Sequence, residues 1–134
     1  MKRIIRAVLI SVICLALSLP ALAHQRKPRK VQITGIYSSL RYVEEAGDLV
    51  GMEVFISYSR DGYHATVQIA EGVMFAPVFV DVQVKGSNIE FIIPGKSGES
   101  VKRYKGRVTA RGLTGKFEDD VAGEFLPRKK SYWQ

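Results

Sequence analysis

The chain has 134 residues, of which 20 are Lys or Arg, 13 are Asp or Glu and one is Cys, with a formal net charge of +7. This length provides one domain of ordinary size and is too short for two. The positive charge lies at the ends, because residues 31–127 contain ten basic and thirteen acidic residues. A mildly acidic body, with no basic face interleaved with aromatic residues, argues against nucleic acid as a partner.

The first 23 residues have the three parts of a cleavable secretory signal peptide. Lys2, Arg3 and Arg6 form the basic start, residues 7–19 form the apolar run, and Ala21-Leu22-Ala23 supplies small residues around a cleavage bond. An apolar run of this length is too short for a membrane-spanning helix, which needs about 20 residues. The sequence therefore predicts a periplasmic or secreted protein that is not transmembrane after cleavage.

Cleavage would remove Cys14 and make His24 the first residue of the mature chain. The exported domain is therefore expected to be free of disulfides. An amino-terminal histidine resembles the copper site of polysaccharide oxygenases and periplasmic copper carriers, in which the terminal amine and the imidazole chelate the metal. Such a site needs a second imidazole, and His64 is predicted on the polar face of a strand. Copper at His24 is thus an alternative, and the main prediction includes no metal and no cofactor.

Basic residues cluster in a short segment, 24–30, and in a C-terminal tail, 128–134. With an even number of strands between them, both clusters would lie at one end of the fold and form a cationic surface. Such a surface would bind lipid head groups or polyanionic envelope polymers, although charged termini also serve only to keep the ends solvated. The residues assigned to this surface are Arg26, Lys27, Arg29, Lys30, Arg128, Lys129 and Lys130.

Between the basic ends, residues 31–127 alternate apolar and polar side chains, which is the period of a half-buried β-strand. The first strand is predicted near residues 31–43. Residues 50–59 and 63–69 come next as a hairpin, because Arg60-Asp61-Gly62 is a turn signal between two alternating runs. Five further strands are predicted at residues 78–85, 89–93, 103–110, 113–117 and 123–126.

The connections between these eight strands are too short for parallel crossovers, so the sequence predicts an antiparallel up-and-down meander. Closure into a small barrel would remove the edges of a sheet rich in valine and isoleucine. A β-sandwich is the alternative. Residues 89–93 and 113–117 are shorter than the 9 to 11 residues of a membrane strand, which argues against an outer-membrane barrel.

Gly35-Ile36-Tyr37 on the first strand and Arg128 after the last resemble the calycin arrangement of lipocalins and avidins. In that superfamily a Gly-x-Trp on strand one packs against a basic residue from the end of the barrel. Here tyrosine replaces the usual tryptophan. The resemblance implies an up-and-down barrel with a binding cavity and carries over no catalytic residue.

An eight-stranded barrel either fills its interior or holds one small ligand. The leading hypothesis is a non-enzymatic module that binds a small apolar or amphipathic ligand or a partner protein; the alternative is an envelope-associated structural or inhibitory module acting through the basic ends. No Ser-His-Asp signature, glycine-rich phosphate loop or zinc spacing indicates catalysis. The aromatic residues predicted to face the interior and contact the ligand are Tyr58, Tyr63, Phe91 and Tyr104.

Overall fold

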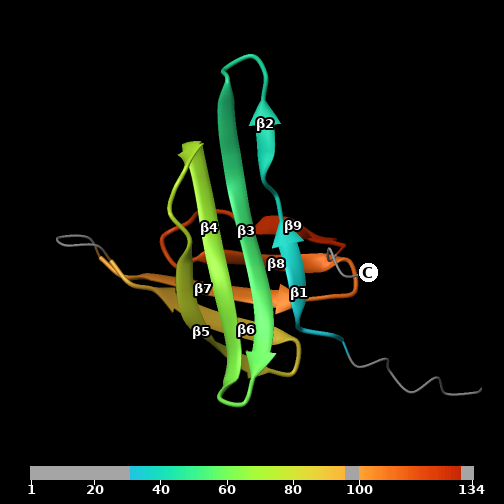
Figure 1. Cartoon of the computed structure of the whole chain (residues 1–134). Helices are drawn as coiled ribbons and strands as arrows, with labels where there is room; N and C mark the ends of the chain where they lie inside the picture. Colours follow the sequence, from blue (N-terminus) through green and yellow to red (C-terminus); the bar gives the residue numbers. More distant parts are fainter. Residues whose placement is uncertain (1–30, 96–99, 131–134) are drawn as a thin grey trace, which may run out of the picture.

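The computed structural model describes residues 31–95 and 100–130, and every regular element in these ranges is a β-strand (Figure 1). The predicted all-β class is confirmed. Within the same ranges no helix is long and apolar enough to cross a membrane. The predicted signal peptide and the basic segment 24–30 lie outside the described residues. The strands are β1 (Gly35–Ser38), β2 (Arg41–Val43), β3 (Asp48–Ser59), β4 (Gly62–Met74), β5 (Val78–Lys85), β6 (Asn88–Ile93), β7 (Lys102–Val108), β8 (Gly112–Phe117) and β9 (Glu124–Lys129).

Eight of these strands close into an antiparallel barrel. From β3 to β9 each strand pairs with its neighbour in the chain, and β1 closes the sheet by pairing with β9 on one side and β3 on the other. Strand β2 lies outside the ring and pairs with β3. The predicted up-and-down barrel is therefore confirmed, and the sandwich alternative is not the fold.

The first predicted strand, residues 31–43, is in fact two strands separated at Ser39. The register is continuous across the break, since Ser38 is opposite Glu53 and Arg41 is opposite Val50. At the break the Ser39 hydroxyl accepts the Met52 N–H at 3.0 Å, in place of a backbone carbonyl. Opposite it, Gly51 has a φ of +112°, and a Cβ there would lie 2.7 Å from the Ser39 carbonyl oxygen. A side chain at this position would therefore collide with the Ser39 backbone, so the break requires glycine.

Strands β3 and β4 form a hairpin that is longer than the barrel. They pair from Leu49–Gly72 to Ser59–Gly62, whereas β4 pairs with β5 only over residues 63–67. The predicted hairpin is confirmed, with Arg60 and Asp61 as turn residues and Gly62 taking the positive φ, +123°. In Figure 1 the other end of this hairpin, together with β2, rises beyond the remaining strands.

Alternate residues of the eight strands point into the barrel and form one hydrophobic core. One end is covered by the chain before β1, where Ile33 is buried and Val31 packs against the core. These buried side chains pack against one another in the middle of the barrel. The largest fully buried side chains are Tyr37, Tyr104, Phe91, Ile56, Leu113, Leu126, Val54, Val67 and Val108.

Candidate functional site

The end of the barrel away from residues 31–34 holds a pocket of about 240 Å³, called the mouth pocket. On one side it is lined by Met52 of β3 and Ile69 of β4, which are opposite each other in the register. On the other side are residues of β7, of β8, of the loop after β8 and of the start of β9. The residues that define the mouth pocket are Met52, Ile69, Lys102, Tyr104, Phe117 and Glu124.

Tyr104 lies at the floor of the mouth pocket and is 1% exposed. Its ring stacks on Phe91 at a centroid distance of 4.7 Å and meets the edge of Phe117 at 5.2 Å. Its hydroxyl group is buried and has no hydrogen-bond partner among the described residues. A buried hydroxyl without a partner lowers the stability of the fold until another group forms a hydrogen bond with it. The Tyr104 hydroxyl is therefore a candidate contact for a ligand.

Gly115 makes room for this hydroxyl. A Cβ on Gly115 would lie within van der Waals overlap of Tyr104 Oη and of the Lys105 carbonyl oxygen. Gly106, the other glycine beside the ring, would place a Cβ 2.9 Å from Tyr104 Cε1. The two glycines therefore allow a large phenol to reach the pocket floor from β7.

The electrostatics of the pocket keep Tyr104 neutral. Burial raises the pKa of its hydroxyl above the usual 10.0, and the carboxylates of Glu124 and Asp120 raise it further. A neutral phenol is both a donor and an acceptor. The pocket thus combines an apolar wall with one hydroxyl at its floor.

The rim of the mouth pocket is charged. Glu71, Asp120 and Glu124 contribute carboxylates, and Lys102 and Lys116 contribute ammonium groups. Lys116 donates to the Asp120 carbonyl oxygen at 2.9 Å. Asp120 is fixed in turn, because its carboxylate accepts the Phe117 N–H at 3.1 Å. A pocket that combines apolar side chains with charged groups is suited to an amphipathic molecule.

Of the four aromatic residues predicted to face the interior, three do so. Phe91 and Tyr104 are fully buried, and Tyr63 packs against the core. The prediction for Tyr58 is wrong, since 65% of it is exposed. By alternation Tyr58 shares the inward face of β3, but it lies at the hairpin tip, beyond the end of the barrel. There its ring contacts the ring of Tyr63 at a centroid distance of 4.7 Å. Of these residues Tyr104 lines the mouth pocket.

Arg128, assigned from the sequence to the cationic surface of a C-terminal tail, is part of the last strand. Arg128 belongs to β9, which extends to Lys129, past the boundary predicted at residue 127. Its guanidinium lies over the Tyr37 ring at 4.8 Å, donates to Tyr37 Oη at 2.7 Å and donates to the Thr34 carbonyl at 2.9 Å. The guanidinium is held in this place because it donates hydrogen bonds to carbonyl oxygens of the segment that covers the barrel end.

This cluster reproduces the contact that the calycin resemblance implies. Gly35 has a φ of +145°, and a Cβ there would lie 2.5 Å from Arg128 Nη1, so glycine is required for the guanidinium to approach the first strand. Tyr37 also donates to the Ile33 carbonyl oxygen at 2.6 Å. Burial raises the pKa of Tyr37, while Arg128 opposes that rise.

The structure describes only some of the other residues predicted on the basic ends. Lys129 is exposed at the end of β9, and Lys130 is exposed directly after it. The proposed copper ligand His24 lies outside the described residues. Among residues 31–95 and 100–130, no group of three or more His, Cys, Asp or Glu side chains is arranged to hold a metal ion. The remaining predicted cations, Arg26, Lys27, Arg29 and Lys30, also lie outside the described residues.

The outer face of β3, β4 and β5 carries a hydrogen-bonded row that sequence reasoning missed. His64 Nε2 lies 2.9 Å from Ser59 Oγ, and His64 Nδ1 lies 2.9 Å from Asp81 Oδ1. This is the connectivity of a Ser-His-Asp triad. His64 faces outward, as predicted, and stacks on Phe79 at 5.3 Å. Its contact with Asp81 could not be predicted, because that contact depends on the register between β4 and β5.

Two features distinguish this row from a catalytic site. The Asp81 side chain is 89% exposed, whereas a triad carboxylate is buried to orient the imidazole. The Asp61 N–H, close to the serine, bonds to Ser59 Oγ itself at 3.1 Å and is not directed toward a substrate oxygen. The row therefore serves best as a set of cross-strand contacts that joins the hairpin to β5.

The fold and the mouth pocket together define a small closed β-barrel with one covered end and one open end. No protein-family model matches the chain, and no curated protein or solved structure shows significant similarity to it. Its function must therefore be inferred from the geometry.

Proposed function

We propose that this chain is an exported, non-enzymatic binding module whose mouth pocket takes one end of a small amphipathic ligand. The observation that carries this proposal is the buried hydroxyl of Tyr104, a residue that lines the mouth pocket, because this hydroxyl has no hydrogen-bond partner among the described residues. A ligand atom that bonds to this hydroxyl regains a hydrogen bond that the unliganded barrel does not make. The export part of the proposal rests on the signal-peptide pattern of residues 1–23.

The size of the pocket limits the ligand. A volume of about 240 Å³ is below the range of roughly 300 to 1,000 Å³ that holds drug-sized molecules. A small molecule, or one end of a longer one, fits this space. Met52, Ile69 and Phe117 supply apolar contact for its body.

The charge of the rim limits the polar group of the ligand. Glu124 and Asp120 are the carboxylates that act on Tyr104, and with Glu71 they outnumber the ammonium groups of Lys102 and Lys116 on the rim, so an anionic group at the floor would meet net repulsion. A neutral carbonyl or hydroxyl oxygen accepts a hydrogen bond from the phenol without that cost. We therefore assign the ligand class as neutral amphipathic molecules with an oxygen acceptor.

The proposal agrees with the calycin resemblance in one structural detail, the Tyr37–Arg128 contact at the covered end. We propose that the barrel uses this contact as calycins do, to hold the first strand against the last. The ligand would then enter at the opposite end, beside Tyr104. One closed end and one open end suit a protein that carries a small molecule.

The test is a thermal unfolding titration with 2-heptanone and heptanoate, which have the same chain length and differ in charge. We expect 2-heptanone to raise the Tm, because a ligand at 100 times its Kd adds about 2.7 kcal/mol to the free energy of unfolding. Heptanoate should raise it less. The Tyr104→Phe variant should lose most of the shift with 2-heptanone.

Tyr63→Phe is the matched control, since Tyr63 packs against the core at the hairpin tip and not at the mouth. Its shift with 2-heptanone should equal that of the wild type. Equal shifts in Tyr104→Phe and wild type, or no shift with 2-heptanone and its longer homologue 2-nonanone, would overturn the proposal.

A further inference from the structure

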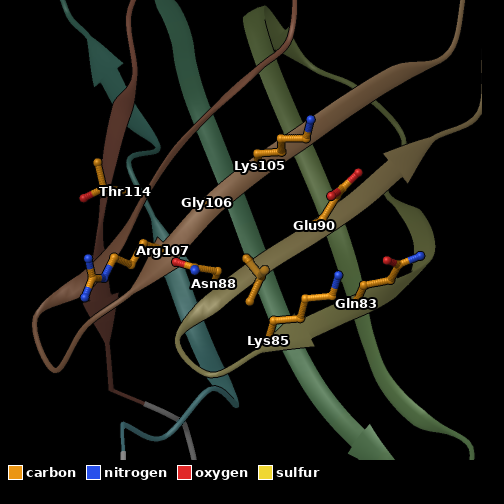
Figure 2. A pocket seen from close by; sticks show the side chains of 9 residues that line it. Gln83, Lys85, Asn88, Glu90, Lys105, Gly106, Arg107 and Thr114 are labelled. Carbon is orange, nitrogen blue, oxygen red and sulfur yellow. The ribbon is translucent and has the colours of Figure 1, made fainter.

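The outer face of the barrel carries a second hollow, unconnected with the mouth pocket, of about 430 Å³. It crosses strands β5 to β8 and is called the outer furrow (Figure 2). Three interstrand spacings give it a length of about 14 Å. The residues that define it are Gln83, Lys85, Asn88, Lys105, Arg107 and Thr114.

The sheet register builds the two walls of the outer furrow. One wall is a cross-strand row in which Asn88 is opposite both Lys85 and Arg107. The other wall is the next outward row, in which Glu90 is opposite both Gln83 and Lys105. Figure 2 shows Lys85, Asn88 and Arg107 one after another across the strands, with Glu90 and Lys105 beside them.

The floor between these walls is made of backbone. Ile89 and Gly106 are opposite each other, and both positions face the barrel interior. Their outward side therefore presents peptide groups without side chains. A backbone floor between two rows of polar side chains admits a linear molecule that lies across the strands.

The carboxylate that lines the outer furrow is already paired. Glu90 accepts from Arg103 Nη1 at 2.6 Å, and this hydrogen bond lowers the pKa of Glu90. Lys105 pairs with Glu118 at 2.9 Å. Neither Lys85 nor Arg107 has a carboxylate within 4.0 Å among residues 31–95 and 100–130. The wall formed by Lys85 and Arg107 is therefore cationic and, among these residues, makes no ion pair.

The polar groups between the cations point to a hydroxylated ligand. The amides of Gln83 and Asn88 and the hydroxyl of Thr114 both donate and accept hydrogen bonds, which suits sugar hydroxyl groups. Arg107 offers a planar fork that binds a carboxylate through two parallel bonds. Stacking aromatic side chains, on which single-stranded nucleic acids rely, do not line the furrow.

We propose that the outer furrow binds a short acidic oligosaccharide, with Lys85 and Arg107 contacting its carboxylates and the intervening amides contacting its hydroxyls. This site is separate from the proposed ligand site at the mouth. An exported protein with both sites would hold an envelope polymer on its outer face and a small molecule at its mouth.

The test is a calorimetric titration of the full mature chain with trigalacturonate, the acidic probe, and with maltotriose, the neutral one. We expect trigalacturonate to bind, and to bind more weakly as salt concentration rises. Maltotriose should bind at least about 10-fold more weakly, because charge-assisted hydrogen bonds contribute about 1.5 to 3 kcal/mol each. The double variant Lys85→Gln/Arg107→Gln should weaken trigalacturonate binding by a factor of about 10 or more.

Lys129→Gln/Lys130→Gln is the matched control, since it removes the same charge from exposed positions outside the furrow. It should change the affinity for trigalacturonate less than about 2-fold. Equal losses in the two double variants would show a non-specific charge effect and overturn the proposal. Tripolyphosphate binding more tightly than trigalacturonate at the furrow would also overturn it, in favour of a phosphate ligand.

The same titration separates this inference from the proposed function. Tyr104→Phe should bind trigalacturonate as the wild type does, because Tyr104 lies on the inward face of β7. A loss of trigalacturonate binding in Tyr104→Phe would contradict the claim of two sites.

Discussion

Removing a hydroxyl group from each of two buried tyrosines should change stability in opposite directions. Tyr104 and Tyr37 are 1% and 0% exposed, and both rings face the barrel interior. The Tyr104 hydroxyl has no partner among the described residues. The Tyr37 hydroxyl donates to the Ile33 carbonyl at 2.6 Å and accepts from Arg128 at 2.7 Å.

These partners determine the expected magnitudes. An unpaired buried hydroxyl costs about 1 to 3 kcal/mol, so Tyr104→Phe should raise the free energy of unfolding by about 1 kcal/mol. For a domain of this size that is about 4 to 8 °C in Tm. Tyr37→Phe removes a bond to a charged group and leaves a buried carbonyl short of a donor. It should lower the free energy of unfolding by about 2 kcal/mol.

Urea unfolding followed by circular dichroism measures both changes, and the midpoint shifts are comparable if the m-values agree. Destabilisation of Tyr104→Phe as large as that of Tyr37→Phe would refute the reasoning, because the Tyr104 hydroxyl would then be hydrogen-bonded in solution. Tyr63→Phe serves as a reference for the loss of a hydroxyl at a partly buried position.

Three further outcomes are expected. Burial raises the pKa of Tyr37 and Tyr104 above 10.0, so above about pH 10 the unfolded chain loses protons that the folded chain retains. Stability should therefore fall as pH rises, by up to about 1.4 kcal/mol per pH unit for each group, and the slope should be smaller in Tyr104→Phe. Gly35→Ala should lower the free energy of unfolding by about 1 to 3 kcal/mol. The loss should be larger than in Gly62→Ala, because both glycines have positive φ but only Gly35 faces Arg128. Equal losses in urea unfolding would mean that Arg128 does not restrict Gly35. Wild type and Ser59→Ala should hydrolyse p-nitrophenyl acetate at the same rate, and a loss of activity in the variant would identify the Ser59–His64–Asp81 row as catalytic.

The barrel is predictable from the sequence because the evidence for it is local. Alternation of side chains gives the face of each strand, and the short connections allow only antiparallel neighbours. For the same reason the assignment of Phe91 and Tyr104 to the interior is correct. Alternation gives no information about where a strand leaves the barrel, and the placement of Tyr58 is wrong because its strand continues past the barrel end.

The candidate sites depend on long-range register, which the sequence pattern does not contain. The mouth pocket needs Met52 and Ile69 of one hairpin to face Tyr104 of β7. Charge counting places Arg128 with the other basic residues, whereas its guanidinium contacts Thr34 and Tyr37, some ninety residues earlier in the chain. The resemblance in Gly35 and Tyr37 is the one sequence signal for that contact.

The central claim is that the open end of the barrel binds a small neutral amphipathic molecule through Tyr104. The most direct measurement is a map of amide chemical-shift changes during titration with 2-heptanone. We predict the largest changes at Met52, Gly115 and Phe117, around the mouth pocket, and little change at Tyr63 on the hairpin tip. Changes centred on the exposed outer residues Phe55 and Phe79, with none at the mouth, would contradict the claim.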